Sequence, residues 1–200
     1  ADYLQFSTKS IGGNKPSDER LFGEVVALIS GAGGTFCSGL LVSDRVVLTA
    51  AHCLCSDPKE VQMGIDPSPA DPPALLDTDK MYLRASATCR DKNTLKGNDF
   101  GLIALKASLG HSASLKFVRL ATETVSNGLA SGQSLYVAGF GSTAIEGRAG
   151  QKNYIQTPVI SPYCSSSADQ AKYGCVKRQE LVSVDPRRTG DGPPTTRASH

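Results

Sequence analysis

The chain has 200 residues and a formal net charge of +2, and 40% of its residues are hydrophobic. This length suits one large domain or two small ones with a substantial core. Lys and Arg are scattered, and the short basic stretch "DPRR" is too small for a nucleic-acid footprint, so nucleic-acid binding is not expected. No apolar run approaches the roughly 18 residues that a membrane-crossing helix needs. The first ten residues lack the features of a signal peptide, so either a leader has been removed or this is not the complete gene product.

Nine stretches are predicted to be β-strands because they are short, rich in β-branched residues and separated by Gly, Pro, Ser or Asp. A proline-rich loop is expected over Asp66–Asp77. Many short strands without helical periodicity favour an all-β barrel or sandwich. In chain order the stretches are Gly23–Ser30, Thr35–Ser43, Arg45–Thr49, Val61–Ile65, Lys80–Cys89, Gly101–Lys106, Ser134–Gly141, Asn153–Ile160 and Glu180–Val184.

The six cysteines form an even set without the spacing of a zinc site. The three histidines, His52, His111 and His200, are far apart in the sequence. Two interpretations remain: disulfides formed in an oxidising compartment, or buried free thiols in a cytosolic protein. The cysteines are Cys37, Cys53, Cys55, Cys89, Cys164 and Cys175.

The stretch "CSGLLVSDRVVLTAAHC", from Cys37 to Cys53, resembles the first-barrel signature of trypsin-like serine endopeptidases, which have the chymotrypsin fold. The family pattern is Cys, Gly, two apolar residues, a turn, an apolar strand and then Thr-Ala-Ala-His-Cys. The resemblance implies that His52 is the general base of a catalytic triad and that Cys37 is bonded to Cys53. The alternative is an ordinary histidine of the core.

"GNDFGLIALK" resembles the second triad element of the same family. There an aspartate opens the pattern Asp-Ile-Ala-Leu and orients the histidine by accepting its far ring proton. Here Asp99 stands at that position, followed by Phe and Gly as an insertion or a substitution. The alternative for Asp99 is a simple turn residue before a strand.

Three further stretches extend the resemblance. "VAGFG" is similar to the Gly-Trp-Gly that opens the second barrel. "SPYC", followed by Cys175, is similar to a helix-and-disulfide loop, which implies the pair Cys164–Cys175. An extra pair, Cys55–Cys89, is expected to tie the loop after the histidine to a neighbouring strand. "KSIGGN" is similar to the activation site, with cleavage between Lys9 and Ser10; the alternative is a Gly-rich turn.

The family's nucleophile motif, Gly-Asp-Ser-Gly-Gly-Pro, has no full counterpart in the sequence. The nearest string is "TGDGPP", in which Gly190, Asp191 and Gly192 are followed by two prolines rather than by a serine. Proline has no N–H group, so these prolines cannot donate to an oxyanion. Three explanations remain open: a degraded motif, a frameshift that takes the chain out of the family, or a truncation.

The resemblance as a whole implies an all-β, chymotrypsin-like double β-barrel whose second barrel is incomplete at the C-terminus. We expect a single peptidase domain over 1–200, with the first barrel at 10–125 and the partial second barrel at 126–200. The implied function is that of a secreted or periplasmic, monomeric serine endopeptidase acting on proteins or peptides without a metal or organic cofactor. This chain as given is expected to be inactive, and the alternative is an inactive homologue that binds or inhibits a protein partner.

Overall fold

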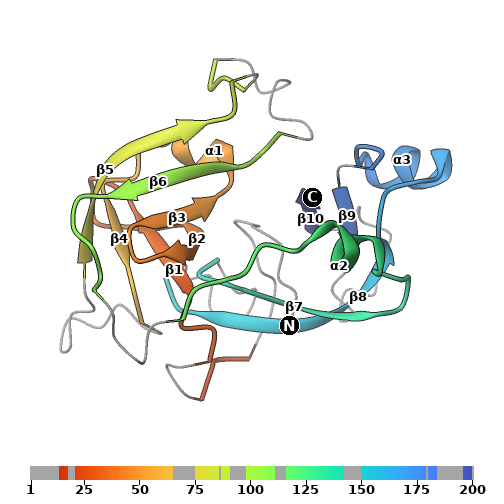
Figure 1. The fold of residues 1–200 in the computed structure, drawn as a ribbon, viewed down its shortest axis with the longest axis horizontal. Helices are drawn as coiled ribbons and strands as arrows, with labels where there is room; N and C mark the ends of the chain where they lie inside the picture. The colour runs from red at the N-terminus through yellow and green to blue at the C-terminus, as the bar shows by residue number, and fades with distance from the viewer. Residues whose placement is uncertain are drawn as a thin grey trace.

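Figure 1 shows the fold in a computed structural model. The structure describes residues 14–17, 21–64, 75–85, 87–90, 98–110, 116–141, 150–178, 180–183 and 196–199. The described residues are mostly strands with a few short helices, and they form a barrel and a separate sheet.

The barrel is built from six antiparallel strands in the order β1-β2-β3-β6-β5-β4. It closes because β1 pairs with β4 as well as with β2, so none of the six strands is left with an open edge. The strands are β1 (Val25–Ile29), β2 (Thr35–Ser43), β3 (Val46–Thr49), β4 (Glu60–Gln62), β5 (Leu75–Leu83) and β6 (Gly101–Leu105).

The barrel core consists of aliphatic side chains from its strands and from residues 50–54, together with one disulfide. Alternate residues of β3 and β6 point inward, which is why Val47 and Ile103 are fully buried and face each other in register. The cluster comprises Val26, Leu28, Cys37, Leu41, Val47, Ala50, Cys53, Leu54, Val61, Ile103 and Leu105.

The second sheet has four described strands in the order β10-β9-β8-β7. They are β7 (Ser134–Gly139), β8 (Asn153–Ser161), β9 (Glu180–Ser183) and β10 (Thr196–Ser199). A closed barrel and a second, partial sheet together confirm the expected all-β, chymotrypsin-like architecture. Strand β10 lies in a stretch where no strand was predicted, because its sequence is short and polar and its strand form depends on pairing with β9.

Among the described residues three short helices accompany the strands: α1 (Ala51–Leu54), α2 (Glu123–Asn127) and α3 (Ser167–Tyr173). The hydroxyls of Thr122 and Ser166 accept N–H groups in the first turns of α2 and α3. No described helix is long and apolar enough to cross a membrane. The predicted boundary after residue 125 lies within α2, and the domain limits stay a prediction.

The strand around residue 80 starts and ends earlier than the sequence suggested. Strand β5 begins at Leu75, so the expectation of a loop over Asp66–Asp77 is wrong for its last three residues. The four prolines of that stretch all precede Leu75, and pairing with β4 then holds the chain extended. The same strand stops at Leu83, and Cys89 lies in a turn.

The barrel and the second sheet are joined by buried polar contacts. The Ser38 hydroxyl in β2 accepts the Phe140 N–H just after β7, at 2.9 Å. The Lys152 side chain is fully buried, donates from Nζ to the Phe22 carbonyl at 2.8 Å, and lies over the Phe140 ring. Such buried polar groups are costly unless they are hydrogen-bonded, so these contacts hold the two parts in one arrangement.

Candidate active site

His52 and Asp99 are 47 positions apart in the sequence and meet because β3 pairs with β6. Strand β3 leads directly into α1, which carries His52, and Asp99 lies two residues before the start of β6. The register pairs Thr49 with Gly101, so the end of one strand and the start of the other are neighbours. Antiparallel pairing therefore delivers the histidine and the aspartate to the same end of the barrel.

Two hydrogen bonds hold the Asp99 carboxylate against His52. One oxygen, Oδ1, accepts the His52 backbone N–H at 2.9 Å, and the other, Oδ2, lies 2.7 Å from the imidazole Nδ1. The side chains of His52 and Asp99 are 41% and 33% exposed, so the pair lies at the surface. The two hydrogen bonds nevertheless keep the two residues together. With Nδ1 facing Asp99, the ring nitrogen that remains for a reacting group is Nε2.

The Asp99 carboxyl keeps its charge in this position. Burial by itself would raise the pKa of Asp99, but the hydrogen bonds from the His52 side chain and backbone, with the charge of the imidazole, lower that pKa below its ordinary value. An ionised carboxylate on Nδ1 fixes the ring tautomer and stabilises the imidazolium that forms when Nε2 takes a proton.

Small residues around the pair make this close approach possible. A Cβ atom added at Gly101 would lie 2.5 Å from Cδ1 of Leu54 and 2.8 Å from the Tyr82 carbonyl oxygen. Ala50 and Ala51 are buried before His52, and the Thr49 hydroxyl donates to the Ser38 carbonyl at 2.8 Å. Gly101 is thus the first residue of β6, and α1 packs directly on it through Leu54.

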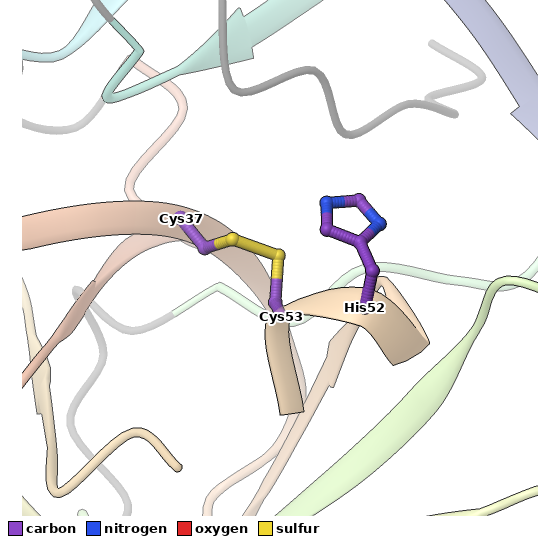
Figure 2. A group of neighbouring side chains, drawn as sticks. All are labelled: Cys37, His52 and Cys53. Atoms are coloured by element: carbon purple, nitrogen blue, oxygen red, sulfur yellow. A yellow bond between two sulfur atoms is a disulfide. The ribbon is translucent and has the colours of Figure 1, made fainter. Parts of the chain in front are cut away.

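All six cysteines are paired in three disulfides, Cys37–Cys53, Cys55–Cys89 and Cys164–Cys175. These are the three pairs expected from the sequence. The first bonds β2 to α1 one residue after His52, and Figure 2 shows the imidazole standing beside this disulfide. This covalent bond fixes α1 to the barrel. It thereby also fixes the backbone position of His52.

Cys37, His52 and Cys53 are also near enough to each other to be considered as metal ligands, with potential ligand atoms within 4.8 Å. The two sulfurs are bonded to each other, so neither is available as the thiolate that a metal requires. Of this group only the imidazole keeps a ligand atom, and one imidazole does not make a metal site.

The remaining predicted site residues lie outside the described residues. They are Lys9 and Ser10 of the expected cleavage site, and Gly190, Asp191 and Gly192 of the degraded motif. His111 and His200 lie outside them as well.

Sequence reasoning missed residues that join the two regions and one that lies beside the pair. Ser38 and Lys152 join the barrel to the second sheet, and Arg84 contacts the residues on both sides of Asp99. Only Ser38 lies within the recognised motif. Arg84 lies inside the predicted strand Lys80–Cys89 and carried no signal there, because its partners come from a distant part of the chain, just before β6.

A family model described as Trypsin matches residues 11–191. This range includes both residues of the pair and all three disulfides. The chain belongs to the trypsin family. The family predicted from the two sequence motifs is thereby confirmed.

Two curated relatives support this assignment. The chain is 30% identical over 155 residues to trypsin beta of Drosophila erecta, which covers 76% of this chain and 58% of that protein. It is 27% identical over 157 residues to the CLIP domain-containing serine protease B4 of Anopheles gambiae, which covers 70% of this chain and 43% of that protein. The aligned part of this trypsin-family chain thus spans about half the length of these relatives.

Proposed function

We propose that this chain descends from a secreted trypsin-like serine endopeptidase and retains two members of its catalytic triad. His52 is the general base and Asp99 is the residue that orients it. The observation that supports this most directly is the double hydrogen bond between Asp99 and His52, in which one carboxylate oxygen binds Nδ1 and the other binds the backbone N–H.

In a chain with the full triad, His52 Nε2 would take the proton of a serine hydroxyl as the serine oxygen attacks a peptide carbonyl. The same nitrogen would then return the proton to the leaving amine. Asp99 stays ionised through both steps and stabilises the imidazolium between them. The substrates of this reaction are proteins or peptides, and no metal or organic cofactor takes part.

The 200 residues of this chain do not themselves supply the nucleophile. No serine follows Asp191 at the position the family uses, and the two residues after Gly192 are prolines, which have no N–H group to donate. In an unrelated protease with the same triad, loss of the nucleophile alone costs about a million-fold in kcat. We therefore propose that these residues alone do not hydrolyse peptide bonds.

The same absence favours a second candidate from a different class: an extracellular, catalytically inactive homologue that binds or inhibits a protein partner. Three disulfides suit an oxidising compartment under either proposal. The protease proposal also includes three predictions: a single domain over 1–200, cleavage between Lys9 and Ser10, and a monomeric state.

Activity measurements separate the two candidates. The 200-residue chain is incubated with peptide ester substrates and with a serine-directed phosphonate probe, and we expect neither turnover nor labelling. Extending the reading frame so that Gly-Asp-Ser-Gly-Gly-Pro follows is expected to restore both. His52→Ala in the extended chain should then abolish turnover.

Stoichiometric labelling of the unextended chain would show that the nucleophile lies elsewhere in it. An extended chain that folds and still neither turns over ester nor takes the label would favour the binding protein. Sequencing the coding DNA past the codon for His200 tells a frameshift from a genuine loss of the motif.

A further inference from the structure

Asp99 lies at the centre of a tight turn whose shape aims its carboxylate. The Phe100 N–H donates to the Asn98 carbonyl at 2.8 Å, a bond between residues two apart that closes a three-residue turn around Asp99. On its C-terminal side the turn is anchored at once, because Gly101 pairs with Thr49 and Leu83 in the barrel. On its N-terminal side the anchor comes from a side chain that directly follows another strand.

That side chain is Arg84, the residue directly after β5. Its Nη1 donates to Asn98 Oδ1 at 2.7 Å, and its guanidinium carbon lies 5.9 Å from the centre of the Phe100 ring. One planar group therefore bonds to the residue before Asp99 and covers the ring of the residue after it. Arginine suits both contacts, because its guanidinium donates hydrogen bonds in its plane and stacks on aromatic rings.

We infer that Arg84 is a positioning residue for Asp99: it holds Asn98 and Phe100, and so keeps the Asp99 carboxylate in place for His52. This role rests on the proposed function of the His52–Asp99 pair. Arg84 works through the shape of the turn. The groups that lower the pKa of Asp99 against the effect of its burial belong to His52 and Ala51, so Arg84 is not its counter-ion.

Nuclear magnetic resonance on the 200-residue protein tests this role without requiring activity. Two signals report the two bonds to Asp99: the low-field proton on His52 Nδ1 and the hydrogen-exchange rate of the His52 backbone N–H. In Arg84→Ala we expect the low-field proton to weaken and the His52 amide to exchange about tenfold faster. In Arg84→Lys, which keeps the charge but lacks the planar group, we expect an intermediate change in both.

The matched control is Arg45→Ala, which removes the same charge at the other end of β3. Arg45 donates from Nη2 to the Lys106 carbonyl at 3.1 Å, so the control also loses one exposed hydrogen bond. We expect both His52 signals to be unchanged in this variant. The urea midpoint should move no further in Arg84→Ala than in Arg45→Ala, which separates positioning from general stability.

Asp99→Asn is the reference for complete loss of the pair, and it separates the possible failures. If Asp99→Asn removes the low-field proton while Arg84→Ala leaves both signals unchanged, the positioning role is wrong and the pair stands. If the parent shows no low-field proton, or Asp99→Asn leaves it unchanged, the pair itself and the function proposed from it are wrong. Should Arg84→Ala fail to fold, the same two signals in Arg84→Lys decide, and parental values there overturn the role.

Discussion

The first barrel and the second sheet bury their strands in different ways. The barrel closes on itself through the pairing of β1 with β4, while the four described strands of the second sheet run from β10 at one edge to β7 at the other. The barrel core is one cluster of eleven buried residues, whereas the strands of the second sheet contribute to smaller clusters. In Figure 1 the two regions lie side by side, with the barrel on the left.

This difference shows which part of the catalytic machinery the chain holds. His52, Asp99 and the disulfide beside them all lie in the barrel region. Both hydrogen bonds between His52 and Asp99 are therefore formed within that region. The degraded motif at Gly190, Asp191 and Gly192 lies outside the described residues. The contacts described for the His52–Asp99 pair therefore come from the barrel region, and four experiments test this separation.

The largest effect is expected from removing the disulfide beside His52. Cys37→Ala with Cys53→Ala opens a link with a sequence separation of 16, which we expect to cost about 3 kcal/mol in urea unfolding. The low-field proton of His52 should weaken, because α1 is no longer bonded to β2. Cys164→Ala with Cys175→Ala is the control in the second region, with a separation of 11 and a similar cost of about 3 kcal/mol. A weaker His52 signal in this control would show that the pair depends on both regions.

Gly101→Ala tests how tightly the barrel packs under the pair. The added methyl group would overlap the Leu54 side chain and the Tyr82 carbonyl oxygen, and the carbonyl belongs to a paired strand and cannot turn away. We expect a loss of about 2 kcal/mol in urea unfolding. Gly31→Ala is the control, because its Cβ would meet nothing nearer than Lys59 Cγ at 3.6 Å, and its stability should stay within about 0.5 kcal/mol of the parent. Equal losses in the two variants would contradict the close packing.

Ser38→Ala tests the contact between the two regions. The variant leaves the Phe140 N–H buried without the hydroxyl that accepts it, which we expect to cost about 1 to 2 kcal/mol. Ser43→Ala is the control, since its hydroxyl accepts the Arg45 N–H at an exposed position and its removal should cost less than about 0.5 kcal/mol. The measurement is urea unfolding followed by fluorescence and circular dichroism. A cost for Ser38→Ala no larger than that of the control would mean that the regions do not rely on this bond.

The smallest effect is the dependence of stability on pH through Asp99. Its pKa is lowered in the folded chain, because the hydrogen bonds and charge of His52 outweigh burial, so the ionised form favours folding. This contribution is present above the unfolded pKa of about 3.9 and is lost as the pH falls through the lower folded pKa. We therefore expect the stability difference between the parent and Asp99→Asn to shrink below about pH 4. A difference that stays constant down to pH 2 would show that Asp99 gains nothing from His52.

The general architecture and both members of the pair could be predicted from the sequence. His52 stands in an unbroken motif from Cys37 to Cys53, and Asp99 stands before a strand of recognisable pattern. Most strand positions were also predictable, because β-branched content and the turn residues between strands are local properties of the chain. The start of β5 was not, since the proline-rich stretch before it predicts a loop and pairing with β4 overrides that preference at Leu75.

Local sequence therefore determined most of the strands and the family of this protein, and the tertiary structure decided how the pair is held. Phe140 meets Ser38 across 102 positions, and Lys152 meets Phe22 across 130. Arg84 reaches Asn98 only because β5 and β6 pair in a register that sets Leu83 beside Gly101. No periodicity or motif encodes these contacts, because each depends on a backbone position that exists only after the barrel has closed.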